Sequence, residues 1–222
     1  MSDGWWAPAF YDWMLAASEA KGLAARRRWL ARSAAGRVLE LGAGTGLNLR
    51  WYRPDDVDSV LALEPHAAMR ARLAQRAATI AVPLEISGAT VGAADLPAAS
   101  FDTVVATLVL CCVDDLPGTV AAVARWLVPG GRLLFLEPVA AGRRRLPRPS
   151  PAVWSRLAGG CRFDRDILGA VRGGGLSVSD CDRFSLPTGG WLSASCVAGV
   201  AWRPPIGEPD PAMSVLAQGA SV

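Results

Sequence analysis

The sequence predicts an α/β fold in which helices cover both faces of a seven-stranded, mostly parallel sheet. Strand-like and helical segments alternate between residues 36 and 136, and this alternation is typical of parallel β-α-β units. The first strand-like segment runs directly into a glycine-rich turn. Two strand-like segments then follow one another late in the chain, which predicts a C-terminal antiparallel hairpin.

Helices are predicted where apolar side chains recur at helical spacing, and strands where short apolar runs stand between turn residues. Gly36 ends the first helix, and Pro129 with the two glycines after it ends the fourth. The expected elements are helix 8–33, strand 37–41, helix 47–52, strand 59–63, helix 66–78, strands 84–87 and 101–108, helix 116–127, strand 132–136, helix 164–172, and strands 176–184 and 195–202. Residues 142–151 hold four arginines and three prolines and are predicted to form a surface loop.

Length and composition favour a single globular domain. The chain has 222 residues, of which 51% are hydrophobic, and this is enough for one self-sufficient core. We expect a helical lid segment over residues 1–35, the domain itself over 36–203 and a mobile tail over 204–222. The net charge of +3 is too small to indicate a nucleic-acid partner. The sequence shows neither a signal peptide nor a run of about 20 apolar residues, which favours a soluble, cytoplasmic protein.

The most informative motif is the glycine-rich turn over residues 40–46, which reads E-L-G-A-G-T-G. Glycines allow a tight turn and a close approach of a ligand to the backbone. A second strand ends at Glu64, 20 residues after Gly44, where an acid can accept hydrogen bonds from both hydroxyls of a ribose. Together the two features predict a site for a nucleoside cofactor beyond the carboxyl ends of the strands.

Two cofactors compete for this motif. A dinucleotide is typically bound by G-x-G-x-x-G, with its pyrophosphate at a helix N-terminus, and such a protein would be an oxidoreductase. Here the pattern is E-x-G-x-G-x-G, and the carboxylate of Glu40 would repel a pyrophosphate. The same carboxylate suits the ammonium group of S-adenosylmethionine, which we therefore favour.

Several segments resemble class I S-adenosylmethionine-dependent methyltransferases. They are V-L-E-L-G-A-G-T-G at 38–46, L-E-P at 63–65, S-F-D at 100–102, T-L-V-L-C at 107–111 and P-G-G at 129–131. The resemblance spans about residues 9–202 and implies a Rossmann-like fold. T-L-V-L-C, G-G-C at 159–161 and E-P-V at 137–139 are similar to the methyltransferase-like branch that contains thiol S-methyltransferases. Bacterial relatives in this branch are often described as phospholipid or quinone methyltransferases.

The resemblance also implies roles for individual residues. Glu40 would lie near the methionine ammonium group and Glu64 would bind the ribose hydroxyls. Tyr11 and Met14 resemble a lid over cofactor and substrate, and Tyr11 and Asp12 are the candidate catalytic residues. The remaining cofactor-binding positions are Gly42, Ala43, Gly44 and Gly46 along the methionine and ribose, Pro65, Gly88, Ala89 and Thr90 around the adenine, and Thr107 and Leu108 beside the methionine moiety.

The expected reaction is methyl transfer to a small, apolar acceptor, with S-adenosylhomocysteine as the product. The chain departs from its bacterial relatives by having Arg162 and Cys196 where they often carry histidines, and His66 is its one histidine. A thiol already exposes some thiolate at neutral pH and needs no histidine base, so a thiol acceptor is favoured. The alternatives are a phospholipid amine, a quinone-type carbon or oxygen acceptor, and a non-catalytic or repurposed cofactor-binding protein. An oxygen nucleophile would need a carboxylate base, for which the candidates are Asp12, Asp114 and Asp115.

Two further features of the sequence are its five cysteines and its aromatic N-terminal segment. No two cysteines have the sequence spacing of a zinc site, so no metal is expected, and core packing is favoured over metal methylation or redox control. Residues 5–13 carry a cluster of aromatic side chains, for which a substrate lid and simple packing are favoured over contact with a membrane surface. The basic runs at 26–28 and 143–145 are interpreted as solvated surfaces. The five cysteines are Cys111, Cys112, Cys161, Cys181 and Cys196.

Overall fold

A computed structural model of the chain describes residues 8–139, 161–162, 164–189 and 192–205. The expected loop at 142–151, the basic run at 143–145 and nearly all of the expected tail lie outside these residues. Across the described ranges, the longest apolar helices fall short of what crossing a bilayer requires.

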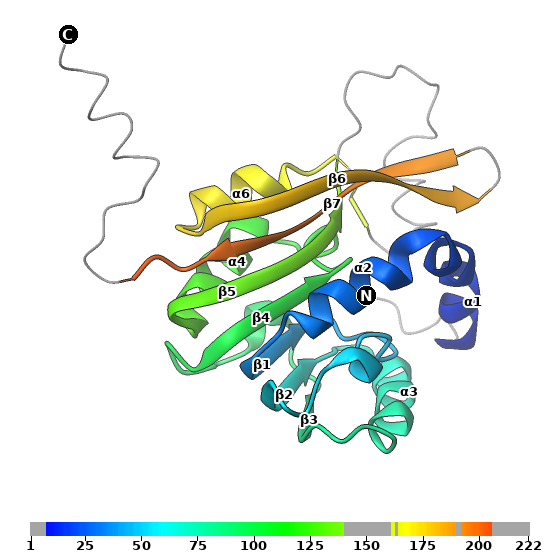
Figure 1. Cartoon of the computed structure of the whole chain (residues 1–222), viewed down its shortest axis with the longest axis horizontal. Helices are drawn as coiled ribbons and strands as arrows, with labels where there is room; N and C mark the ends of the chain where they lie inside the picture. The colour runs from blue at the N-terminus through cyan, green and yellow to red at the C-terminus, as the bar shows by residue number, and fades with distance from the viewer. Residues whose placement is uncertain (1–7, 140–160, 163, 190–191, 206–222) are drawn as a thin grey trace, which may run out of the picture.

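The core of the fold is a seven-stranded sheet with the order β3-β2-β1-β4-β5-β7-β6 (Figure 1). The first five strands are parallel to one another, and β7 runs antiparallel to both β5 and β6. This arrangement confirms the predicted fold class, including its C-terminal hairpin. The strands are β1 (Gly36–Leu41), β2 (Val57–Leu63), β3 (Leu84–Ser87), β4 (Phe101–Thr107), β5 (Leu127–Pro138), β6 (Ser177–Gly189) and β7 (Leu192–Trp202).

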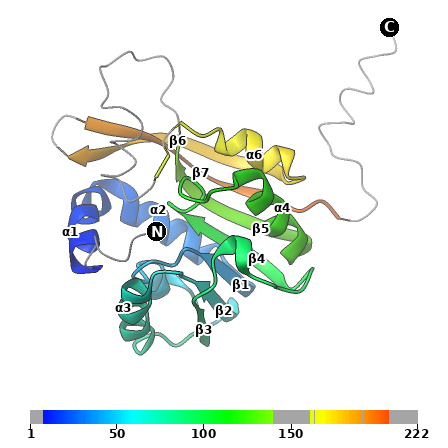
Figure 2. The ribbon, with the colours of Figure 1, turned by 180° about the vertical axis from the view of Figure 1, so that it is seen from behind.

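Helices cover both faces of the sheet, because neighbouring residues of each buried strand point to opposite sides. In β1, Leu39 packs with α4 and α6, whereas Val38 packs with α2 and α3. Figures 1 and 2, seen from opposite sides, show α2 over one face and α4 with α6 over the other. The helices are α1 (Pro8–Ser18), α2 (Ala24–Arg32), α3 (Ala67–Ala77), α4 (Leu116–Trp126) and α6 (Ile167–Gly173).

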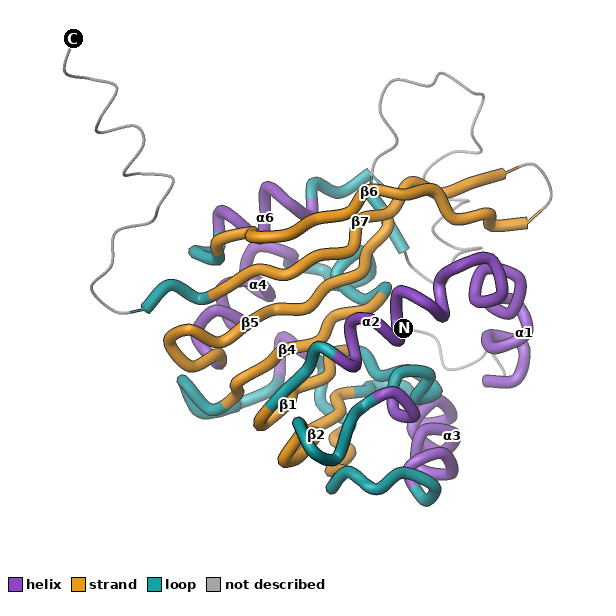
Figure 3. The backbone as a smooth tube through the Cα atoms, viewed as in Figure 1, coloured by secondary structure: helices purple, strands orange, loops and turns teal. Residues whose placement is uncertain are grey.

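The prediction of one continuous helix over residues 8–33 is wrong. Between α1 and α2 lies a π-helical turn, Glu19–Leu23, in which Lys21 and Gly22 leave helical geometry. Gly22 has a φ of +119°, which a side chain would disfavour and which redirects the chain. The bend separates α1 from α2, so α1 can lie across the end of the sheet while α2 packs on its face (Figure 3).

The predicted helix at 47–52 is also wrong, because the structure has only one 3₁₀ turn there, Leu49–Trp51. Tyr52 is already extended, and Arg53 precedes a proline, a position that disfavours helix. The strand predicted at 132–136 is longer than expected, since β5 begins at Leu127, before the Pro-Gly-Gly segment. A shift in register between β4 and β5 accommodates the extra residues.

The carboxyl ends of the parallel strands lie at one edge of the sheet. Leu41 of β1 pairs with Leu63 of β2, which in turn pairs with Ser87 of β3. On its other side Leu41 pairs with Ala106 of β4. The strand order reverses between β1 and β4, and such a switch point is where open α/β sheets bind ligands.

The packing of β7 between β5 and β6 depends on Gly199. A Cβ atom at Gly199 of β7 would lie 2.8 Å from Cζ of Phe135 and would also contact the backbone carbonyl oxygen of Asp180. We predict that Gly199→Ala lowers the free energy of unfolding by about 1–3 kcal/mol, because the strands must move apart. Urea denaturation measures this difference. Gly92→Ala is the matched control, since its added Cβ meets nothing within 4 Å, and equal stability of the two variants would contradict the account.

Candidate active site

A small, partly open cavity lies at the switch point between β1 and β4. Its walls come from the end of β1, the glycine-rich turn, the end of β4 and the N-terminal helices. It therefore brings together segments that are far apart in the sequence. The lining residues are Tyr11, Arg27, Glu40, Gly42, Ala43, Gly44, Thr45, Leu47, Asn48 and Thr107.

Glu40 brings a buried carboxylate to this cavity. Its side chain accepts hydrogen bonds from Nδ2 of Asn48 at 2.8 Å and from the hydroxyl of Tyr52 at 2.9 Å. Burial raises the pKa of Glu40 to about 7, although both donors and the charge of Arg27 oppose the rise. A positive ligand group beside Glu40 would stabilise its ionised form.

Arg27 lines the same cavity and is only 5% exposed, so the interpretation of residues 26–28 as a solvated surface is wrong at this position. Its Nε donates to Glu19 at 2.7 Å and its Nη1 to Oδ1 of Asn48 at 3.3 Å. A carboxylate and a guanidinium thus line one small cavity. This pair of charges matches the ammonium and carboxylate groups of an amino acid.

The glycines of the turn have different structural roles, as Gly46 and Gly44 show. Gly42, Gly44 and Gly46 all have positive φ angles, of 57°, 59° and 85°. A Cβ at Gly46 would lie 2.7 Å from Cδ1 of Leu73, so that glycine is needed for packing. A Cβ at Gly44 would have only the carbonyl oxygen of Gly42 within 4 Å, at 3.9 Å. Gly44 therefore leaves room for a ligand to approach the backbone.

Glu64 is linked directly to the glycine-rich turn. Its Oε2 accepts a hydrogen bond from the backbone N–H of Gly44, and its Oε1 accepts one from the N–H of His66, both at 2.8 Å. A carboxylate has about four lone-pair positions, so it can still accept bonds from two hydroxyl groups. The contact fixes the end of β2 beside the turn, and the predicted ribose-binding role of Glu64 stays a prediction.

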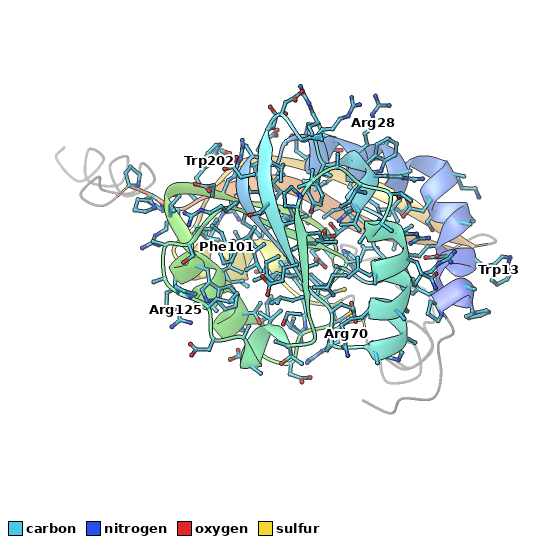
Figure 4. All side chains as sticks on the ribbon, turned by 90° about the horizontal axis from the view of Figure 1, so that it is seen from below. Trp13, Arg28, Arg70, Phe101, Arg125 and Trp202 are labelled. Atoms are coloured by element: carbon cyan, nitrogen blue, oxygen red, sulfur yellow. The ribbon has the colours of Figure 1, made fainter. Side chains whose placement is uncertain are left out.

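The positions predicted around an adenine lie beside Glu64 but outside the lining of the cavity. Pro65 is exposed, and Ser87 accepts a hydrogen bond from the N–H of Glu64 immediately before Gly88. Arg70, labelled in Figure 4, donates to the carbonyl oxygen of Glu64 at 2.8 Å, and its guanidinium lies over Gly88. The other positions predicted in this group, Ala89 and Thr90, continue the chain from there into a 3₁₀ turn.

The two candidate catalytic residues have different surroundings. Tyr11 is half-buried and lines the cavity. Burial raises the pKa of its hydroxyl well above the usual value, which Arg27 opposes and three nearby thiols reinforce. Asp12 lies outside the cavity lining, where its oxygens contact Thr45 Oγ1 and Arg76 Nη2, each at 2.6 Å. Asp12 thus fastens α1 to the turn and to α3, and its catalytic role stays a prediction.

The end of β4 is held in an unusual conformation. Thr107 accepts a hydrogen bond from Nδ2 of Asn48 at 3.1 Å, and Leu108 has a φ of +57°, which is rare for a residue with a side chain. The buried carboxylate of Glu137 accepts hydrogen bonds from the next three N–H groups. Burial raises the pKa of Glu137 to about 8, against the effect of these donors. The hydrogen bonds to Glu137 therefore stabilise the turn that follows the strained backbone at Leu108, which is typical of functional turns.

Sequence reasoning missed Arg27, Asn48 and Tyr52 as site residues. Asn48 and Tyr52 lie in the segment 47–52, which is predicted to be a helix, and Arg27 belongs to no recognised motif. It also missed a meeting of Cys111, Cys112 and Cys161, whose sulfur atoms all lie within 4.8 Å of one another. Of the other expected base candidates, Asp115 caps α4 by accepting the N–H of Gly118 at 2.9 Å, and Asp114 is exposed.

Comparison with known proteins finds methyltransferases. Residues 39–135 match the model of a methyltransferase domain, a range that includes both strands flanking the cavity. The chain is also similar to thiol S-methyltransferase TMT1B of Rattus norvegicus, with 32% identity over 136 residues. These matches support a class I S-adenosylmethionine-dependent methyltransferase. The match to TMT1B covers 58% of this chain and 55% of that protein, so the chain spans about half the length of this relative.

Solved structures of methyltransferases share the fold. An S-adenosylmethionine-dependent methyltransferase from Mesorhizobium loti aligns with a TM-score of 0.64 at 24% identity, covering 86% of this chain and all of that one. The [4+2]-cyclase SpnF also aligns with a TM-score of 0.64, at 18% identity, covering 81% of this chain and 80% of its own. At these identities the likeness shows the fold alone, and the cyclase shows that one fold hosts more than one reaction.

The residues of the cavity fit S-adenosylmethionine, the cofactor of this family. The opening beside Gly44 admits a ligand to the backbone, and Glu40 and Arg27 present the two charges that an amino-acid tail requires. Residues 42–52 form turns rather than an α-helix, so the pyrophosphate of a dinucleotide would find no helix N-terminus there. The structure therefore favours S-adenosylmethionine over a dinucleotide.

The raised pKa of Glu40 predicts how cofactor binding depends on pH. Ionised Glu40 attracts an ammonium group and neutral Glu40 does not, so the affinity for S-adenosylhomocysteine should rise about tenfold between pH 5.5 and 7.0. Calorimetry at a series of pH values measures this slope. Glu40→Gln should bind weakly with almost no slope, whereas the exposed Glu85→Gln should behave as the wild type. A wild-type affinity that is constant over this range would contradict the assignment.

Proposed function

We propose that this protein is an enzyme that transfers a methyl group from S-adenosylmethionine to a small thiol. The observation that carries the proposal is the cavity at the switch point, where Glu40 and Arg27 face a glycine-rich turn that Glu64 braces. When bound, the cofactor supplies an electrophilic methyl group on a sulfonium sulfur. The protein has to align the acceptor and exclude water, since this displacement needs little else.

Each polar group around the cavity has a role in this proposal. Glu40 would bind the ammonium group of the cofactor and Arg27 its carboxylate. Asn48 holds Glu40 and Thr107 in place through the two hydrogen bonds that its Nδ2 donates. Glu64 would bind the ribose hydroxyls with the lone pairs that Gly44 and His66 leave. Pro65, Gly88, Ala89 and Thr90 would flank the adenine.

Among the described residues that line the cavity, the one carboxylate is Glu40, which the proposal assigns to the cofactor, and this favours a thiol over an oxygen acceptor. His66, the one histidine of the chain, caps α3 by accepting a bond from the N–H of Met69. Asp12 and Asp115 are engaged by other groups, and the raised pKa of Tyr11 keeps its hydroxyl neutral. A thiol with a pKa near 8.5 supplies thiolate at neutral pH without such a base. The name of the relative TMT1B, a thiol S-methyltransferase, supports the same acceptor.

A panel of acceptors tests the proposal. The purified chain is incubated with S-adenosylmethionine and matched pairs such as thiophenol and phenol, or 2-mercaptoethanol and ethylene glycol. Release of S-adenosylhomocysteine is then measured. We expect turnover with the thiols alone. Turnover restricted to phenols or amines would refute the thiol assignment, and binding without any turnover would refute the enzyme.

Glu64→Gln tests the placement of the cofactor. An amide has one acceptor oxygen, so it cannot receive both backbone N–H groups and two ribose hydroxyls. We expect the affinity for S-adenosylhomocysteine to fall at least tenfold, while Glu85→Gln on the neighbouring strand keeps the wild-type value. Circular dichroism confirms that both variants are folded, and an unchanged affinity in folded Glu64→Gln would contradict the placement.

A further inference from the structure

Three cysteine side chains from two distant parts of the chain meet beside the cavity. The sulfur of Cys112 lies 3.5 Å from that of Cys111 and 2.9 Å from that of Cys161, which is 49 residues away. Cys111 is buried and the other two are half-buried. Among the described residues, the group consists of these three thiols, and no histidine or carboxylate belongs to it.

The surrounding structure holds the three thiols together. The turn carrying Cys111 is fixed by Glu137, whose Oε2 accepts the N–H of Cys111 at 3.1 Å. The carbonyl oxygen of Cys111 accepts the N–H of Arg162 at 2.9 Å, which anchors the segment of Cys161. Arg165 donates to the carbonyl oxygen of Leu110 at 3.3 Å, so a positive charge stands beside the group. Hydrogen bonds behind the ligands are the usual support of a metal site.

The geometry of the sulfur atoms suits a zinc ion. In a tetrahedral site with Zn–S distances of about 2.3 Å, the sulfur atoms lie roughly 3.8 Å apart. Here they lie at 2.9 Å, at 3.5 Å and within 4.8 Å of one another, so small rotations of the side chains would reach that spacing. Three thiolates select soft or borderline ions, and three protein ligands leave the fourth zinc position open, as in catalytic zinc sites.

We propose that Cys111, Cys112 and Cys161 bind a zinc ion whose fourth coordination position takes the sulfur of the acceptor thiol. This rests on the proposed function and names how the acceptor is recognised. The two features are adjacent in the structure, because Sγ of Cys112 lies 3.8 Å from the carbonyl oxygen of Leu108, the residue after the cavity-lining Thr107. On binding zinc, each cysteine releases its S–H proton to solvent. The acceptor thiol likewise releases its proton when its sulfur binds the ion, and remains there as a thiolate.

Metal content and cobalt spectra test the site without relying on activity. The full chain, purified under reducing conditions, should bind one Zn²⁺, and Cys112→Ser should weaken that binding at least about 100-fold. Cys181→Ser on β6 is the matched control and should bind as the wild type. The Co²⁺ form should show thiolate-to-cobalt charge transfer and the d–d bands of a tetrahedral site.

The acceptor part of the proposal has its own readout. Adding 2-mercaptoethanol should shift the bands of the Co²⁺ form, whereas 2-methoxyethanol should leave them unchanged. Zn²⁺ binding no tighter than in Cys112→Ser, or a Cys112–Cys161 disulfide in place of the metal, would overturn the site. A spectrum unaffected by 2-mercaptoethanol, or full thiol methylation by metal-free protein, would overturn its role.

Failure of the proposed function can be distinguished from failure of the zinc site. Binding of S-adenosylhomocysteine, measured by calorimetry, should be the same in Cys112→Ser and the wild type, because these thiols lie outside the lining of the cavity. A protein with the expected cobalt spectra and thiol shift that never releases S-adenosylhomocysteine would refute methyl transfer and leave the zinc site standing.

Discussion

The site depends above all on one buried carboxylate, that of Glu40. A charge placed at the end of a central strand is costly unless hydrogen-bond donors meet it. The donors are Asn48 and Tyr52, which follow the glycine-rich turn, and the chain reaches them through turns and a 3₁₀ segment. Asn48 also contacts Thr107 and Arg27. One amide side chain therefore connects β1, β4 and α2 around the cavity.

The N-terminal segment completes the site that the sheet begins. Tyr11 of α1 and Arg27 of α2 both line the cavity, and the bend at Gly22 allows the two helices to approach it from different directions. Asp12 bonds to Thr45 and Arg76, so α1 is attached to the turn that it covers. The expected division of the chain, with a lid over residues 1–35, stays a prediction.

Sequence reasoning predicted what depends on local pattern. The sheet, the hairpin and the position of the glycine-rich turn at the end of a strand follow from periodicity and from the alignment of parallel strands. It could not predict Arg27, because its burial depends on how α2 packs rather than on its own neighbours in the sequence. It likewise could not predict the thiol cluster, since Cys161 returns to Cys111 and Cys112 only through tertiary structure. The helix expected at 47–52 failed because Asn48 and Tyr52 are required as donors to Glu40.

A crystal structure of the chain with S-adenosylhomocysteine would test the central claim most directly. The account predicts that the ammonium group lies within hydrogen-bonding distance of Glu40, the carboxylate beside Arg27 and the ribose hydroxyls on Glu64. The ligand would then pass over Gly44, where the backbone is open. A ligand bound elsewhere, or one whose amino-acid tail points away from Glu40 and Arg27, would contradict the account.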